Sequence, residues 1–186
     1  MNQKPKILAH ICCAPDALYV VGLLQENYQV TGFFYNPNIQ PPEEYELRLQ
    51  EVKRVAGHLN FELIEGPYDL ENWLRLTEKF KDEPEKGRRC RICYAWRLHQ
   101  TALLAKERQI PLYTTIMSIS PWKSAEVLNT IGRMTGRKIG VEFLEANFKK
   151  KDGFRKSVIL SKEFGLYRQN YCGCRYSLSS RKNQVS

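Results

Sequence analysis

The stretch Lys6-Ile7-Leu8-Ala9-His10-Ile11-Cys12-Cys13-Ala14-Pro15-Asp16 decides the fold of this 186-residue chain. Its first half, residues 6–11, is a short apolar run of the kind that forms a buried strand. A proline and then residues 16–27 follow, with apolar side chains at the spacing of a helix. Cys12 and Cys13 therefore occupy a strand-to-helix turn, which is where ligands bind in open α/β sheets.

The same alternation of strand and helix continues along the chain. Residues 28–35 and 61–65 are expected as the second and third strands, and residues 43–58 between them have the spacing of an amphipathic helix. This order predicts an α/β fold with a parallel sheet and right-handed crossovers. The proline-rich loop 36–42 again follows a strand, so we expect it on the same side of the sheet as the cysteines.

The later elements are less regular. The segment 66–108 breaks the alternation and is expected as a helical insertion in a single domain of residues 1–186. Expected elements are helices at 68–80 and from about 90 to 108, a strand at 111–116, a helix at 123–136, a strand at 141–144 and a helix at 157–164. Ser120 is expected to cap the helix after it, and residues 181–186 to form a frayed end.

The chain is basic. Its formal net charge is +9 and its isoelectric point is about 9.3, which fits a polyanionic partner but equally fits a merely soluble basic surface. No apolar run has the length of a membrane span, and no signal peptide is apparent, so the cytoplasm is the expected location and no membrane partner is expected.

The six cysteines form three close pairs, and they admit three chemistries. The pairs are Cys12-Cys13, Cys90-Arg91-Ile92-Cys93 and Cys172-Gly173-Cys174. Structural disulfides suit small secreted chains, whereas this chain is long enough to bury a core. One zinc ion takes four ligands and leaves two thiols unexplained. A [4Fe-4S] cluster also takes four thiolates, and the two remaining thiols then serve chemistry beside it. The two thiols that exceed the four ligands of one metal centre favour a catalytic site.

Together the motifs around these cysteines resemble the QueH epoxyqueuosine reductases. The matching residues are Cys-Cys-Ala-Pro-Asp at 12–16, Asn-Pro-Asn-Ile at 36–39, Cys-Arg-Ile-Cys-Tyr at 90–94 and Tyr-Cys-Gly-Cys at 171–174. They occur in the right order over essentially the whole chain. The resemblance implies a HUP-type, Rossmann-like parallel sheet with helices on both faces and extra helical segments. It also implies the last step of queuosine biosynthesis, the cobalamin-independent reduction of epoxyqueuosine to queuosine at the wobble position of tRNA with a GUN anticodon.

The strand-to-helix turn departs from that of ATP-using relatives in a way that supports this interpretation. Those enzymes carry Ser-Gly-Gly-x-Asp-Ser there, whereas residues 11–16 contain no glycine, so the backbone does not cradle a pyrophosphate. The chain also lacks a GxGxxG dinucleotide motif. Reduction of an epoxide to an alkene needs two electrons, which a cofactor must deliver from an electron donor protein or another reductant.

The resemblance leads to a first ligand assignment. Cys12, Cys13, Cys90 and Cys93 are expected to hold a [4Fe-4S] cluster. Cys172 and Cys174, with Asp16, are expected to form the catalytic group beside the cluster, either as a redox-active disulfide or as ligands of an additional iron ion. Asp16 has an alternative role in the first turn of its helix, where it interacts favourably with the helix dipole. Two adjacent cysteines are geometrically awkward ligands for one cubane. Cys12 or Cys13 is therefore alternatively a ligand of the second centre.

Substrate contacts are expected from aromatic and cationic side chains near the cysteines. The aromatic candidates are Tyr35, Trp122, Tyr171 and Tyr176, each of which is alternatively a packing residue. The cationic candidates are Arg88, Arg89, Arg91, Arg97, Lys149, Lys150 and Lys151. Two other functions compete with the reductase: a zinc-stabilised tRNA-binding module and a dithiol oxidoreductase.

Overall fold

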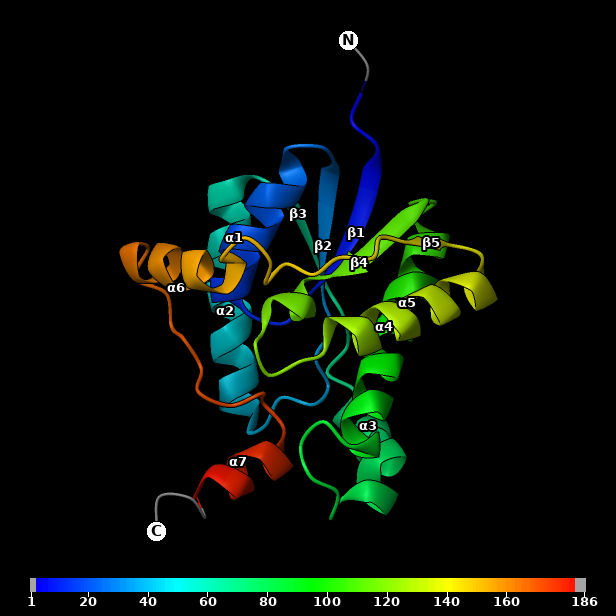
Figure 1. Cartoon of the computed structure of the whole chain (residues 1–186), viewed down its shortest axis with the longest axis vertical. Helices are drawn as coiled ribbons and strands as arrows, with labels where there is room; N and C mark the ends of the chain where they lie inside the picture. The colour runs from blue at the N-terminus through cyan, green and yellow to red at the C-terminus, as the bar shows by residue number, and fades with distance from the viewer. Residues whose placement is uncertain (1–2, 183–186) are drawn as a thin grey trace.

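The computed structural model describes residues 3–182, with side chains to residue 178, and its centre is a parallel sheet (Figure 1). The strands are β1 (Lys6–Ile11), β2 (Gln29–Phe34), β3 (Glu62–Glu65), β4 (Leu112–Thr115) and β5 (Glu142–Phe143). Their order is β3-β2-β1-β4-β5, and each neighbouring pair is parallel. The five strands expected from the sequence are confirmed, with ends that differ by at most one residue.

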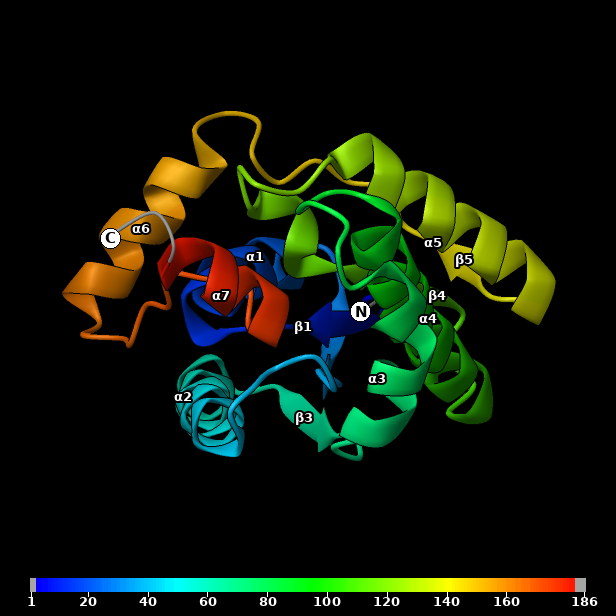
Figure 2. The same ribbon diagram turned by 90° about the horizontal axis from the view of Figure 1, so that it is seen from below.

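Helices cover both faces of this sheet, as Figure 2 shows from the edge where the strands end. One face carries α1 (Ala14–Gln25), α2 (Pro42–Leu59) and α6 (Gly153–Glu163), and the other carries α4 (Arg88–Glu107) and α5 (Ala125–Ile139). Beyond the carboxyl ends of the strands lie α3 (Leu70–Thr77) and α7 (Arg175–Lys182). Two short 3-10 helices, η1 (Glu78–Phe80) and η2 (Ile116–Ile119), complete the elements.

The alternation of side chains along β1 builds a hydrophobic core on each side of the sheet. Ile7, Ala9 and Ile11 belong to the core beneath α1 and α2, while Leu8 belongs to the core beneath α4 and α5. Successive side chains of a strand point to opposite faces, and both faces here are covered, so every side chain from Ile7 to Ile11 is buried. This explains why residues 7–11 are apolar except for His10.

The carboxyl end of β1 is the point where the strand order reverses. From β1 the chain moves outward to β2 and β3, and then crosses back to β4 on the other side of β1. Such a switch point opens a crevice between the loops that leave the two neighbouring strands. Cys12 and Cys13 directly follow β1, so the fold places them in this crevice.

Several helix boundaries differ from the sequence-based expectation. Helix α1 begins at Ala14, and Asp16 is in its first turn as expected. The cap of α5 is Ser124, whose side chain accepts the backbone N–H of Val127, so the expectation for Ser120 was wrong. The Ser120 side chain instead accepts the N–H of Trp122 within a turn.

The ends of the chain bring further differences. Helix α6 begins at Gly153, four residues before the expected start, and α7 was not expected from the sequence. Residues 181 and 182 belong to α7 rather than to a frayed end, and residues 183–186 lie outside the described part. In segment 66–108, α4 packs against β1 and β4 and forms the crossover between β3 and β4.

Candidate functional site

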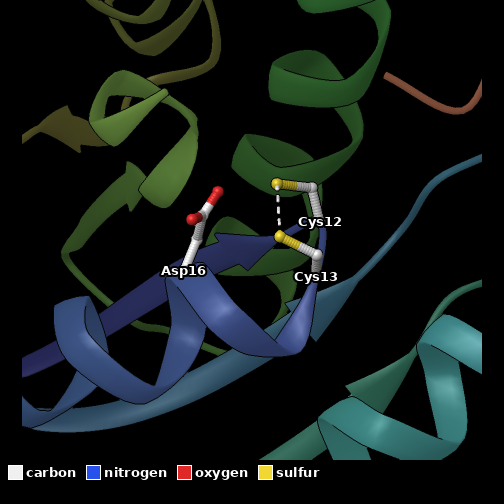
Figure 3. A group of neighbouring side chains, drawn as sticks. All are labelled: Cys12, Cys13 and Asp16. Atoms are coloured by element: carbon white, nitrogen blue, oxygen red, sulfur yellow. Dashed lines mark hydrogen bonds between the residues drawn. The ribbon is translucent and has the colours of Figure 1, made fainter. Parts of the chain in front are cut away.

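Cys12, Cys13 and Asp16 converge in the strand-to-helix turn (Figure 3). The Sγ atoms of the two cysteines are 4.0 Å apart, and all three potential ligand atoms lie within 4.8 Å of one another. Two thiolates on one tetrahedral ion are roughly 3.8 Å apart, because a metal–sulfur bond is about 2.3 Å long. The separation of the pair therefore suits a single metal ion, and the carboxylate is a potential third ligand.

The chain holds Asp16 in place from two later segments. Ser157 Oγ of α6 lies 3.3 Å from the Asp16 carboxylate, and Arg168 Nη2 lies 3.9 Å from it. Both contacts join residues more than 140 positions apart. Asp16 therefore sits in a tertiary contact network, beyond its local position at the start of α1.

The two vicinal thiols share a hydrogen bond, and it makes them unequal. This bond, aided by the charges of Lys123 and Arg97, lowers the pKa of Cys12 to about 7, although burial opposes the change. The same bond, together with burial, raises the pKa of Cys13. Cys12 is therefore the thiol of the pair that more readily becomes a thiolate, which is the form that binds a metal.

The other four cysteines line a second cavity. Cys90 and Cys93 lie in the first two turns of α4, while Cys172 and Cys174 precede α7, with their Sγ atoms 3.5 Å apart. Cys172 also borders a neighbouring cavity that Cys12 and Asp16 line. All six cysteines are described and all are free thiols, so the structure contains no disulfide between them. The sequence-based candidates are thus together at one edge of the sheet, in two adjoining groups.

The thiols of this second group differ in how readily they lose a proton. Burial raises the pKa of Cys90 to about 11 and also raises that of Cys93. A negative charge on Cys172 raises both values further, because like charges repel. Hydrogen bonding from Cys174 lowers the pKa of Cys172 to about 5. Four neighbouring thiolates are therefore costly in the free protein, and a metal centre offsets that cost.

Arg48 of α2 holds the loop that carries Cys172 and Cys174. Its buried guanidinium donates to the carbonyl oxygens of Tyr171 and Cys172, at 3.3 and 3.2 Å. Gly173 adopts a φ of 115°, and its carbonyl accepts the N–H of Gln40 at 2.8 Å. A Cβ at Gly173 would lie 2.9 Å from Ile39, so this close approach requires glycine.

Arg97 of α4 is a buried cation between the two groups of cysteines. Its Nη2 donates to Oδ1 of Asn36 at 2.6 Å, and its Nε donates to Nε2 of His10 at 3.3 Å. His10 is neutral, because burial and the charge of Arg97 keep its pKa well below the ordinary value. Both hydrogen-bond partners are thus uncharged, which leaves the positive charge of Arg97 to act on Cys12 and Cys93.

Three cationic candidates for phosphate contact have internal roles instead. Arg97 is buried as described above, and the buried Arg89 donates to backbone carbonyls of the loop before α4, including those of Phe80 and Lys81. Lys149 donates to the carbonyls of Ser120 and Lys123 at 3.2 and 2.6 Å. The remaining candidates, Arg88, Arg91, Lys150 and Lys151, are exposed.

Among the aromatic candidates, Trp122 differs from the other three. Tyr35 and Tyr171 are buried, and the Tyr171 hydroxyl donates to the carbonyl of Gln40 at 2.6 Å. Tyr176 packs against the Trp73 ring. Trp122 is 63% exposed and borders both cavities.

Sequence reasoning gave no role to three residues that shape the site: His10, Arg48 and Trp73. Arg48 had a detectable signal, because it lies on the same helix face as the buried Tyr45 and Val52. A charged side chain on an apolar face requires buried partners. Trp73 gave no comparable signal, since its neighbours Cys93 and Cys174 are distant in the sequence.

The fold and this site define a class: a Rossmann-like α/β protein that gathers thiols at the switch point of its sheet. Two solved structures share the fold. The U34-tRNA thiolase NcsA of Methanococcus maripaludis, solved with its [4Fe-4S] cluster, aligns with a TM-score of 0.60 at 12% identity over 99% of this chain and 65% of that one. A predicted subunit of a tRNA methyltransferase from Methanocaldococcus jannaschii aligns with a TM-score of 0.55 at 11% identity, over 85% and 76% of the two chains.

Sequence comparison identifies the family. The model of the family "Epoxyqueuosine reductase QueH" matches residues 7–180. Epoxyqueuosine reductase QueH of Thermotoga maritima is 39% identical over 96% of this chain and 93% of its own length. The Acinetobacter baylyi protein of the same name is 37% identical over 95% and 82%. The chain belongs to the QueH family of epoxyqueuosine reductases, and it is therefore an oxidoreductase rather than a zinc-stabilised binding module.

Among residues 3–182, no helix is both long enough and apolar enough to cross a membrane.

Proposed function

We propose that this reductase acts on epoxyqueuosine at the wobble position of tRNA with a GUN anticodon, through a [4Fe-4S] cluster and a second metal ion. One observation carries the proposal: five of the six free thiols and the Asp16 carboxylate, from three distant segments, line two adjoining cavities, and the Sγ atom of Cys13 lies 4.0 Å from that of Cys12. The surplus of ligands over one tetrahedral site, in a chain of charge +9, fits a redox enzyme with a polyanionic substrate.

The geometry supports a ligand assignment that differs from the sequence-based expectation. We assign the cluster to Cys90, Cys93, Cys172 and Cys174, because these four thiols line one cavity. Cys12, Cys13 and Asp16 then hold a single ion, which agrees with the close spacing of their ligand atoms. Thiolate and carboxylate ligands together suit iron or another transition metal.

The reaction converts the epoxide to an alkene and releases the oxygen as water, using two electrons and two protons. A bound cluster supplies electrons singly from an external donor, and the neighbouring ion supplies Lewis acidity. Lys123 borders both cavities and lowers the pKa of both Cys12 and Cys172 through its charge. The same cation is placed to stabilise negative charge that develops on the departing oxygen.

Metal analysis of anaerobically purified variants tests the assignment. The unaltered protein is expected to contain about four sulfides and more than four irons per chain. Cys90→Ala and Cys172→Ala are expected to lose most iron and sulfide, because each removes one of the four thiolates assigned to the cubane. Asp16→Asn is expected to keep its sulfide and lose about one iron, since the hard charged ligand of the single ion is gone.

The control for Asp16→Asn is Asp69→Asn, which alters a carboxylate that bonds Tyr35 and Asn72 rather than a cysteine. It is expected to keep full metal content. If Cys172→Ala keeps all its iron and sulfide but loses activity, the pair Cys172 and Cys174 acts as a redox dithiol and the assignment fails. Zinc without iron in the unaltered protein would reject the cluster itself.

A further inference from the structure

Trp122 is placed at the rim shared by the two cysteine cavities. The chain contains three tryptophans; Trp73 is buried and Trp96 is half-buried, whereas Trp122 is 63% exposed. Trp122 borders the cavity of Cys90 and Cys93 and also that of Cys12. An aromatic ring exposed at a cavity mouth offers a large apolar face that a ligand entering the cavity can cover.

The backbone of the turn that carries Trp122 is fixed in place. The N–H of Trp122 donates to Ser120 Oγ at 3.3 Å, and the N–H of Lys123 donates to the Ser120 carbonyl at 3.2 Å. Lys149 Nζ then binds the carbonyls of both Ser120 and Lys123. The turn is thus closed internally and anchored from a second segment, which lowers the entropy lost when the ring meets a ligand.

Cations surround the exposed ring. Lys86 Nζ lies 5.8 Å from the centroid of the indole, and Lys123 borders both cavities. Arg168 lines the cavity of Cys12, and Glu85 is the acidic residue that borders both. An aromatic platform among lysines and arginines matches a nucleobase with its phosphates, since bases stack on aromatic rings and phosphates pair with cations.

We propose that Trp122 is the platform on which an unstacked nucleobase of the tRNA loop stacks, while Lys86 and Lys123 meet the adjoining phosphates. Enzymes that act on a base take it out of its stack, so a platform at the cavity mouth stabilises the extruded loop. The proposal rests on tRNA being the substrate. It adds a binding residue that is not among the thiols and the carboxylate assigned to the metal groups.

Binding of an anticodon stem-loop RNA tests this role. In Trp122→Ala the dissociation constant is expected to rise about 5- to 150-fold, the range observed when a stacking aromatic is removed, and in Trp122→Phe much less. The slope of log affinity against log salt should stay unchanged in Trp122→Ala, because no phosphate contact is lost, and should become shallower in Lys123→Ala. The RNA should also quench tryptophan fluorescence in the unaltered protein, and this quenching should be lost in Trp122→Phe.

The matched control is Met134→Ala, which removes a 65% exposed apolar side chain from α5. It should bind RNA like the unaltered protein. Unchanged RNA affinity in Trp122→Ala overturns the proposal. If that variant also loses activity with a protein electron donor but keeps it with dithionite, the ring docks the donor instead. Metal content measured in the same samples reports separately on the cluster. The stacking role of Trp122 can therefore be disproved while the cluster stands, and the cluster can be disproved while the stacking role stands.

Discussion

At the scale of single residues, Trp73 has an unusual polar group. Its indole N–H is buried and has no well-formed hydrogen bond, although the ring packs against Cys93 and Cys174. Burial raises the pKa of the Cys93 thiol, and Trp73, which packs in the same cluster, partly opposes this rise. A buried donor without a partner is costly, and a thiolate ligand of a metal cluster is an acceptor that would satisfy it.

We therefore predict that Trp73→Phe lowers the reduction potential of the cluster by about 20–60 mV. This range corresponds to one hydrogen bond of about 0.5–1.5 kcal/mol that stabilises the reduced, more negative state. A redox titration followed by electron paramagnetic resonance measures it. Trp96→Phe is the control, because that N–H donates to the Tyr35 hydroxyl at 2.8 Å. Equal potentials in all three proteins would show that Trp73 only packs.

At the scale of elements, the site depends on contacts between segments that are far apart in the sequence. The loop of Cys172 and Cys174 is joined to α2 by Arg48 and to the loop after β2 by Gln40. Arg48 in turn pairs with Glu44, one helical turn before it, at 2.7 Å. Helix α2 is rigid and packs on the core, so it fixes a loop that has little regular structure of its own.

Arg48→Met is expected to lower the free energy of unfolding by about 2–4 kcal/mol and to reduce the iron content. It leaves two buried carbonyls without a charged donor and releases the cysteine loop. Arg54→Met is the matched control: Arg54 also donates to two carbonyls, those of Phe164 and Gly165, but at an exposed site away from the cysteines. Thermal unfolding and iron analysis are the measurements. Full iron content in Arg48→Met would show that the cysteine loop holds its position without the clamp.

At the scale of the whole molecule, charge and topology act together. The chain carries 29 lysines and arginines against 20 acidic residues, and its site lies at the carboxyl edge of the sheet. Lys150 and Lys151 are exposed and follow Lys149, which is bonded to the turn of Trp122. These two lysines therefore lie on the side of the molecule where the tRNA is proposed to bind.

We predict that tRNA affinity falls steeply with salt, because each phosphate contact releases counterions. The double variant Lys150→Ala, Lys151→Ala should reduce the slope of log affinity against log salt by about 1–2. Lys6→Ala, Lys106→Ala is the control, since both residues are exposed at the opposite edge, where β1 begins and α4 ends. A shallow slope in the unaltered protein, or equal slopes in both double variants, would contradict this surface.

The sequence by itself determined the alternation of strands and helices in the first half and the turn that carries Cys12 and Cys13. These features are local: an apolar run, a helical period and a proline each act within a few residues. It also proposed all six cysteines and Asp16 as candidate site residues. The spacing within each pair, however, contains no information about the distances between pairs, so the partition of ligands stayed open.

Only the tertiary structure decided which groups are neighbours. It joined Cys172 and Cys174 to the cavity of Cys90 and Cys93, and it left Cys12 and Cys13 with Asp16. In the structure Arg97 is buried and Trp122 is exposed, although both are candidate substrate contacts in the sequence. The physical reason is that burial and contact depend on how helices and loops pack across the sheet, and residues 80 to 160 positions apart in the chain meet only there.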